Sequence, residues 1–191
     1  AIYNLAYIDY VEGRYDKALE AFTSLQRDDV YDALVPYYIG EIHLIRGAYQ
    51  QADEVASDYL RHFAGHKDEL EMKRIQGEAR YGLKDYLNSV PSLEAYVAGT
   101  PAPLRNALYK LGMGYYHTGA FTKSVEALGE AAIERDALSQ NAYLHMGLAY
   151  LQLKERNQAR MAFEQAASKN ADKNIKEQAA YNYALCIHET S

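Results

Sequence analysis

The tripeptides Gly13-Arg14-Tyr15, Gly47-Ala48-Tyr49, Lys84-Asp85-Tyr86 and Gly119-Ala120-Phe121 recur along the chain at spacings of 34, 37 and 35 residues. A motif with a period of that length is typical of a helical-repeat array. In such an array each repeat buries its apolar face only by stacking on its neighbours, and the stack presents an extended surface to a partner. The recurrence therefore predicts a binding protein, without indicating what it binds.

Each tripeptide separates two segments that carry apolar residues at helical spacing. In the first unit the pattern runs through residues 2–8, breaks at Gly13 and resumes at Ala18 and Phe22. The same pair returns at 39–45 with 52–60, at 108–116 with 125–132, and at 143–151 with 159–167. Strand signals are nearly absent. We expect an all-α fold, a right-handed solenoid of about five antiparallel helix pairs plus one terminal helix over 179–189.

Prolines mark the edges of several helices. Pro36 and Pro91 stand where the first turns of helices are expected, a position that tolerates proline. The segment Thr100-Pro101-Ala102-Pro103 resists helix formation, because the residue before a proline avoids the helical region. It predicts a connection between two helices.

Composition excludes several classes of partner. Apolar residues make up 49% of the 191 residues, which is enough for a continuous core. The net charge of −6, without a basic cluster, argues against nucleic acid. No apolar stretch approaches the ~18 to 20 residues that cross a bilayer, so we expect no membrane insertion of this segment. Because the chain begins with Ala1 and both ends fall inside repeats, we expect a fragment of a longer protein.

The same pattern of large and small residues recurs in equivalent helices of different units. In first helices it reads Leu108-x2-Leu111-Gly112-x2-Tyr115 and Tyr143-x2-Met146-Gly147-x2-Tyr150, and in second helices it reads Ala18-x3-Phe22 and Ala159-x3-Phe163. This pattern resembles the tetratricopeptide repeat, whose consensus runs W-x2-L-G-x2-Y, then A-x3-F, then P. Small residues stand where two helices approach closely, at Ala6, Gly40, Gly77, Gly112, Gly147 and Ala184. The resemblance covers the whole chain and implies a single array with repeats at about 1–33, 34–69, 70–104, 105–139 and 140–174 and a partial repeat at 175–191.

The third unit departs from the consensus. Lys73 and Gln76 replace large apolar residues, and Ser89 replaces an alanine. We expect the helix pair of this unit to be shifted or looser.

The resemblance also implies a binding surface, because first helices of the family line a concave groove. Projected onto this chain, the groove contains Tyr3, Tyr7, Tyr10, Tyr37, Glu41, Leu44, Arg74, Glu78, Tyr81, Tyr109, Met113, Tyr116, His117, Leu144, Leu148, Tyr181 and Leu185. The chain has 19 tyrosines and no tryptophan, and tyrosine is enriched at recognition surfaces. The alternative is that these rings fill gaps between adjacent first helices.

The groove lacks the lysine and asparagine clamp with which some members of the family hold a C-terminal carboxylate. Tyr37 and Tyr109 are among the residues at the lysine position, and Met113 and Leu148 are among those at the asparagine position. A receptor for chaperone tails is therefore disfavoured. We expect instead an apolar peptide segment or partner subunit, with Arg74 as a lone cation and Glu41 and Glu78 available to pair with a basic residue.

Motifs for catalysis are weak, and we expect a protein that is not an enzyme and needs no metal or cofactor. His62 and His66 have the spacing of metal ligands on a helix, but they run into a helix end without a fixed third ligand. Cys186 has no recognisable activating partners and cannot form an internal disulfide.

Two functions compete with the scaffold. Stacked aromatic rings also suit glycans, although sugar platforms favour tryptophan. The terminal helix lacks a second-helix partner and offers a face for self-association into a homo-oligomer. Similar arrays occur in bacterial envelope assembly, so the bacterial periplasm is favoured over the cytoplasm.

Overall fold

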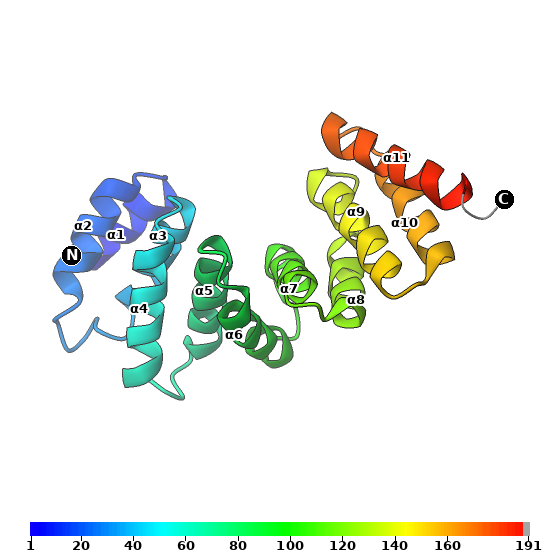
Figure 1. The fold of residues 1–191 in the computed structure, drawn as a ribbon. Helices are drawn as coiled ribbons and strands as arrows, with labels where there is room; N and C mark the ends of the chain where they lie inside the picture. Colours follow the sequence, from blue (N-terminus) through cyan, green and yellow to red (C-terminus); the bar gives the residue numbers. More distant parts are fainter. Residues whose placement is uncertain (189–191) are drawn as a thin grey trace. The chain divides into compact units, whose positions relative to one another are not determined.

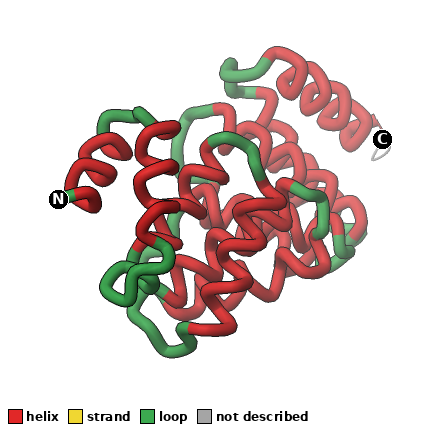
Figure 2. The backbone as a smooth tube through the Cα atoms, turned by 90° about the vertical axis from the view of Figure 1, so that its left-hand side faces the viewer, coloured by secondary structure: helices red, strands yellow, loops and turns green. Residues whose placement is uncertain are grey.

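The computed structural model describes residues 1–188, which form eleven α-helices and, over that range, no strand (Figures 1 and 2). Residues 189–191, including Glu189 at the end of the expected terminal helix, lie outside the described residues. The all-α class of helix pairs followed by a single helix is confirmed. No helix within the described residues is both long and apolar enough to cross a membrane.

The helices fall into two compact units that meet at Pro101 and Ala102. Unit 1 contains α1 (Ile2–Val11), α2 (Tyr15–Leu25), α3 (Val35–Ile45), α4 (Tyr49–His62), α5 (Glu69–Gly82) and α6 (Tyr86–Gly99). Unit 2 contains α7 (Arg105–His117), α8 (Phe121–Ala131), α9 (Ala137–Gln152), α10 (Arg156–Ala167) and α11 (Lys173–His188). The repeat boundaries and the single array stay predictions.

The odd-numbered helices are the first helices of the pairs. Each packs on the second helix that follows it, from α1 on α2 to α9 on α10. First helices also lie beside one another within a unit: α3 contacts α5, α7 contacts α9, and α9 contacts α11. Side chains from consecutive repeats can therefore meet on the first-helix side of each unit.

Each pair is joined by the same left-handed turn. The turn residue has a positive φ in all five pairs: 75° at Gly13, 68° at Gly47, 62° at Lys84, 80° at Gly119 and 62° at Lys154. In the first turn the Arg14 amide donates to the Asp9 carbonyl at 2.8 Å and the Gly13 amide to Tyr10 at 3.1 Å, which is the Schellman pattern. The predicted register is confirmed, including the repeat in which Lys84 replaces glycine.

Three small residues of the first helices, Gly77, Gly112 and Gly147, stand where a second helix packs against them. A Cβ atom added to Gly77 would lie 2.6 Å from Leu93 Cγ, and one added to Gly112 would lie 2.7 Å from Leu128 Cγ. A Cβ on Gly147 would lie 2.4 Å from the ring of Phe163. These separations are shorter than van der Waals contact, so the expectation of close helix approach at these glycines is confirmed.

The expectation of a shifted or looser third pair is wrong. α5 and α6 pack closely through Gly77, and their polar residues bond to each other. The Ser89 hydroxyl donates to the Gly77 carbonyl at 2.7 Å, and the Ser92 hydroxyl donates to Gln76 Oε1 at 2.7 Å. Since buried polar groups are tolerated when they are hydrogen-bonded, this pair replaces apolar contacts with satisfied polar ones.

One expectation about prolines is confirmed and one is wrong. Pro36 lies in the first turn of α3, as predicted. Pro91 lies inside α6 and not in its first turn, because the left-handed turn at Lys84 starts this helix at Tyr86. Pro91 is exposed, and its missing amide leaves the carbonyl four residues earlier without its helical partner.

Candidate interaction surface

The predicted groove residues all lie on first helices, three to a helix in unit 1. They are Tyr3, Tyr7 and Tyr10 on α1, Tyr37, Glu41 and Leu44 on α3, Arg74, Glu78 and Tyr81 on α5, Tyr109, Met113, Tyr116 and His117 on α7, Leu144 and Leu148 on α9, and Tyr181 and Leu185 on α11. Their exposure differs widely. Tyr7 and Tyr181 are 45% and 66% exposed, whereas Arg74 and Glu78 are each 5% exposed.

Arg74 is the centre of an ion network in unit 1. Its Nε lies 2.7 Å from Glu71 Oε2 and its Nη1 lies 3.1 Å from Glu78 Oε1, while its Nη2 pairs with the Glu41 carboxylate of the neighbouring first helix. The expectation that Arg74 is a lone cation and that Glu41 and Glu78 are free carboxylates is therefore wrong. Positions 33 residues apart lie side by side on adjacent first helices, and positions 74 and 78 are one helical turn apart.

In the network around Arg74 the ion pairs join one cation to several carboxylates. One guanidinium faces three carboxylates. Burial alone would lower the pKa of Arg74, but the charges of Glu41 and Glu78 and the hydrogen bonds to Glu41 and Glu71 raise it above its ordinary value. Arg74 therefore remains a fixed cation that holds these glutamates in place.

Two predicted tyrosines lie next to this network. Burial and the charge of Glu41 raise the pKa of Tyr10 to about 12, and the same two causes raise the pKa of Tyr37. Both rings are half-buried, and no residue of the described part of the chain hydrogen-bonds to either hydroxyl. Since these hydroxyls are not buried, they are hydrogen-bonding groups available at the surface.

Tyr38 joins the aromatic residues of α1 and α3. Its ring is edge-on to Tyr10 with centroids 5.3 Å apart and edge-on to Tyr37 at 5.2 Å, and it stacks on Phe22 at 4.8 Å. Phe22 is fully buried in the core of unit 1. The tyrosines of this side are thus held in place by an aromatic contact that reaches the core.

A cavity of about 360 Å³ opens among these residues. It is lined by Tyr3, Leu34, Tyr37, Tyr38, Lys67, Asp68 and Glu71. Two of these residues belong to the predicted groove, and Glu71 belongs to the Arg74 network. The sequence analysis missed Glu71 and Tyr38, although the spacing of three residues between Glu71 and Arg74 is a signal for an ion pair on one helix face.

Other predicted tyrosines pack across the turns. Tyr10 and Tyr15 are edge-on with centroids 6.1 Å apart, Tyr81 and Tyr86 at 5.5 Å, and Tyr116 and Phe121 at 5.8 Å. Each ring at the end of a first helix therefore contacts the ring that begins the second helix. This packing lies within a helix pair and is not the filling of gaps between adjacent first helices, and it explains why the aromatic residue recurs with the turn.

In unit 2 most of the predicted groove residues lie on α7 and α9. The Tyr109 hydroxyl donates to Asn141 Oδ1 at 3.1 Å, and the ring of Tyr116 is edge-on to His145 at 5.3 Å. Burial raises the pKa of Tyr109 and lowers that of His145. The sequence analysis did not select Asn141 or His145, which occupy positions next to the chosen register.

The remaining unit 2 residues divide between core and surface. Leu144 is 4% exposed in a cluster with Phe163 and Ala179, and Met113 is 5% exposed. Leu148 packs partly buried against the same cluster as Leu144. Tyr181 and Leu185 on α11 are exposed.

The histidines that have metal-ligand spacing bond to different partners. His62 Nδ1 lies 2.8 Å from the Asp58 carbonyl, and His66 Nδ1 lies 2.5 Å from the Tyr59 hydroxyl. No group of three or more histidine, cysteine, aspartate or glutamate side chains within the described residues is arranged to hold a metal ion. Cys186 is buried in unit 2.

Comparisons with known proteins point to one repeat family. A family model for the tetratricopeptide repeat matches residues 141–172, and no curated protein matches the chain. The solved structure of YrrB, described as a TPR protein with an unusual peptide-binding site, is similar with a TM-score of 0.77, 18% identity and coverage of 94% of this chain and 90% of that chain. A MamA fragment from Desulfovibrio magneticus RS-1 has a TM-score of 0.70 and 24% identity and covers 86% of this chain and 90% of that chain.

A second MamA structure, named MSR-1 C2, has a TM-score of 0.70 and 17% identity over 93% of this chain and 96% of that chain. At such identities the likeness concerns the fold alone. The chain is a tetratricopeptide-like helical-repeat protein.

Proposed function

We propose that the chain is a non-catalytic scaffold that binds a peptide segment or partner subunit on the first-helix side of its repeats. The observation that carries this proposal is the cavity lined by Tyr3 and Tyr37 beside the Arg74 network. It combines aromatic area, available hydroxyls and negative charge at one place in unit 1. Such a combination is typical of recognition surfaces.

The exposed and half-exposed members of the predicted set are the proposed contact residues. In unit 1 these are Tyr3, Tyr7, Tyr10, Tyr37, Glu41, Leu44 and Tyr81, and in unit 2 Tyr109, Tyr116, His117, Leu148 and Tyr181. The buried members Arg74, Glu78, Met113 and Leu144 hold these residues in place from below. A few of the tyrosines should carry most of the binding energy, at ~2 kcal/mol or more each.

The charge of the surface indicates which segment it prefers. The cavity lining holds the carboxylates of Asp68 and Glu71 and one lysine, Lys67. This excess of one negative charge favours a segment with a basic residue next to its apolar side chains. The comparison with YrrB supports a peptide as the class of ligand, since that protein is described as having a peptide-binding site.

The proposal is tested by partner capture with the chain as bait, followed by mass spectrometry. Tyr37→Ala tests unit 1 and Tyr109→Ala tests unit 2. Val30→Ala and Leu87→Ala are matched controls, because these side chains are 70% and 77% exposed and lie outside the predicted set. We expect one partner to be lost with Tyr37→Ala or Tyr109→Ala and retained with both controls, while the melting temperature stays within a few degrees of wild type.

Equal capture by all variants would contradict the proposal. Loss of capture together with loss of folding would show that these rings belong to the core.

The exposed face of α11 favours self-association as a second candidate function. Tyr181 and Leu185, one helical turn apart, are 66% and 41% exposed. Sedimentation equilibrium of the wild type and of a Tyr181→Asp, Leu185→Asp variant tests it. A concentration-dependent oligomer that the variant lacks is expected, and a wild type that is monomeric at all concentrations would exclude it.

A further inference from the structure

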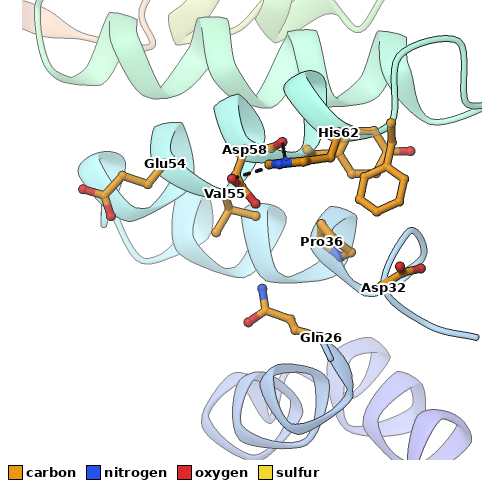
Figure 3. Close-up of a pocket in the computed structure, with 9 residues that line it drawn as sticks. Gln26, Asp32, Pro36, Glu54, Val55, Asp58 and His62 are labelled. Atoms are coloured by element: carbon orange, nitrogen blue, oxygen red, sulfur yellow. Dashed lines mark hydrogen bonds and ion pairs between the residues drawn. The ribbon is translucent and has the colours of Figure 1, made fainter. Parts of the chain in front are cut away.

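A second cleft lies in unit 1, and none of the predicted groove residues lines it. It has a volume of about 580 Å³, within the usual range of binding sites. Its walls come from the end of α2, the connection to α3, the start of α3 and one face of α4. The lining residues are Gln26, Asp32, Pro36, Glu54, Val55, Asp58, Tyr59, His62 and Phe63 (Figure 3).

Part of the cleft lining is apolar. Pro36 is buried in the first turn of α3, and Val55 packs against the cores on both sides of it. The rings of Tyr59 and Phe63 lie 5.1 Å apart, and the Tyr59 hydroxyl is bonded to His66 Nδ1 at 2.5 Å. Tyr59 is 1% exposed and Phe63 is half-buried, so Phe63 is the ring of this pair that a ligand can contact.

Two of the three carboxylates in the lining, Asp32 and Glu54, have no cationic partner among the described residues, whereas Asp58 lies 3.5 Å from His62 Nδ1 within the cleft. Asp32, Glu54 and Asp58 line the cleft, and no lysine or arginine does. Asp58 pairs with Arg61 at 2.9 Å on the exposed surface of α4. Glu54 accepts a hydrogen bond only from the neutral amide of Gln50, at 3.0 Å, and the Asp32 carboxylate has no partner within residues 1–188.

The apolar surface and the carboxylates together match an arginine side chain. A guanidinium stacks on aromatic rings and donates in a fork to carboxylates, while its methylene stem packs on apolar surface. In Figure 3 the side chains of α4 form one wall, and Pro36, Asp32 and Gln26 face them.

We propose that this cleft is a second docking site, which takes an arginine-bearing segment of a partner protein. The charge complementarity selects the occupant, because an acidic or neutral segment would leave Asp32 and Glu54 uncompensated. The cleft is independent of the first-helix surface, so an experiment can disprove one of these two proposed sites and leave the other supported.

The test is fluorescence anisotropy with a labelled, capped peptide of alternating arginine and alanine, compared with the same peptide carrying glutamine for arginine. The whole chain is used. The test variant is Asp32→Asn, Glu54→Gln. The matched control is Asp29→Asn, Glu20→Gln, which changes the net charge equally at two exposed residues outside the cleft.

We expect saturable binding of the arginine peptide that is at least fivefold weaker with the test variant and within twofold of wild type with the control. The glutamine peptide should not saturate, and Tyr37→Ala should leave binding unchanged. Absence of saturable binding, an equal loss in both charge variants, or a loss with Tyr37→Ala alone would overturn the proposal.

Discussion

Gly112 in α7 offers the sharpest test of how the helix pairs are packed. A Cβ atom at this position would lie 2.7 Å from Leu128 Cγ, 2.9 Å from Leu128 Cδ2 and 3.0 Å from the Leu128 backbone nitrogen. Leu128 is fully buried in α8, so its side chain has no free space to enter. Even Gly112→Ala must therefore push α7 and α8 apart.

The magnitude follows from two opposing effects. Overfilling a packed contact costs about 1–3 kcal/mol. Alanine is better than glycine inside a helix by about 1 kcal/mol, which offsets part of this cost. Because the contact includes backbone, we place the cost in the upper part of the range and expect a net loss of about 1–2 kcal/mol in the free energy of unfolding.

Gly129→Ala is the matched control in the neighbouring helix α8. A Cβ atom there meets only Met146 Cε, at 3.7 Å, which is ordinary contact. This variant should gain about 0.5–1 kcal/mol from helix propensity. The assay is urea unfolding followed by circular dichroism. A Gly112→Ala protein as stable as the Gly129→Ala protein would refute the close approach of α7 and α8.

Three further perturbations follow from the structure. Lys84→Gly and Lys154→Gly should each raise the unfolding free energy by about 0.5–1 kcal/mol. A left-handed conformation costs residues other than glycine about 1–2 kcal/mol, and the greater entropy of glycine in the unfolded chain cancels about half of the gain. Urea unfolding measures the change, and no gain would mean that the two lysines are not strained in these turns. Burial lowers the pKa of His145 below its ordinary value of 6.5, so the unfolded chain binds more protons and stability falls as the pH drops below about 6.5. His145→Gln should make the unfolding free energy less sensitive to pH between about pH 7 and about pH 5, and an unchanged slope would contradict the burial of this ring. Arg105→Ala should lower the unfolding free energy by about 1–2 kcal/mol, because Arg105 donates two hydrogen bonds, of 2.6 and 2.7 Å, to the carboxylate of Asp136. That side chain is 39% exposed, so solvent screens part of the interaction. Thermal unfolding at low and high salt measures the loss, and a loss below the error of the measurement would refute the pair.

The helix pairs and their register were predictable because the turn chemistry is local. Glycine at positions 13, 47 and 119 predicts a left-handed backbone at each of these turns. The aromatic residue two positions later identifies the equivalent turn at Lys84. The close approaches at Gly77 and Gly112 were predictable for the same reason, since a small residue at a fixed place in each repeat has a steric cause.

Features that depend on pairs of residues were not predictable from one position at a time. Lys73, Gln76 and Ser89 break the apolar pattern, yet Ser89 bonds to a backbone carbonyl and Gln76 to another side chain. Arg74 looked like a lone cation, because its three glutamates come from two helices. In α9 the register selected Leu144, whereas Asn141, three residues before it, and His145, one residue after it, contact side chains of α7.

The central claim is that the first-helix tyrosines beside the Arg74 network form a surface and are not required for the core. The unfolding free energies of Tyr37→Ala and Tyr59→Ala, measured side by side, test it most directly. Tyr59 is 1% exposed, so its truncation should cost about 3–5 kcal/mol, whereas the half-buried Tyr37 should cost about 1 kcal/mol. A Tyr37→Ala protein destabilised as much as Tyr59→Ala would contradict the claim.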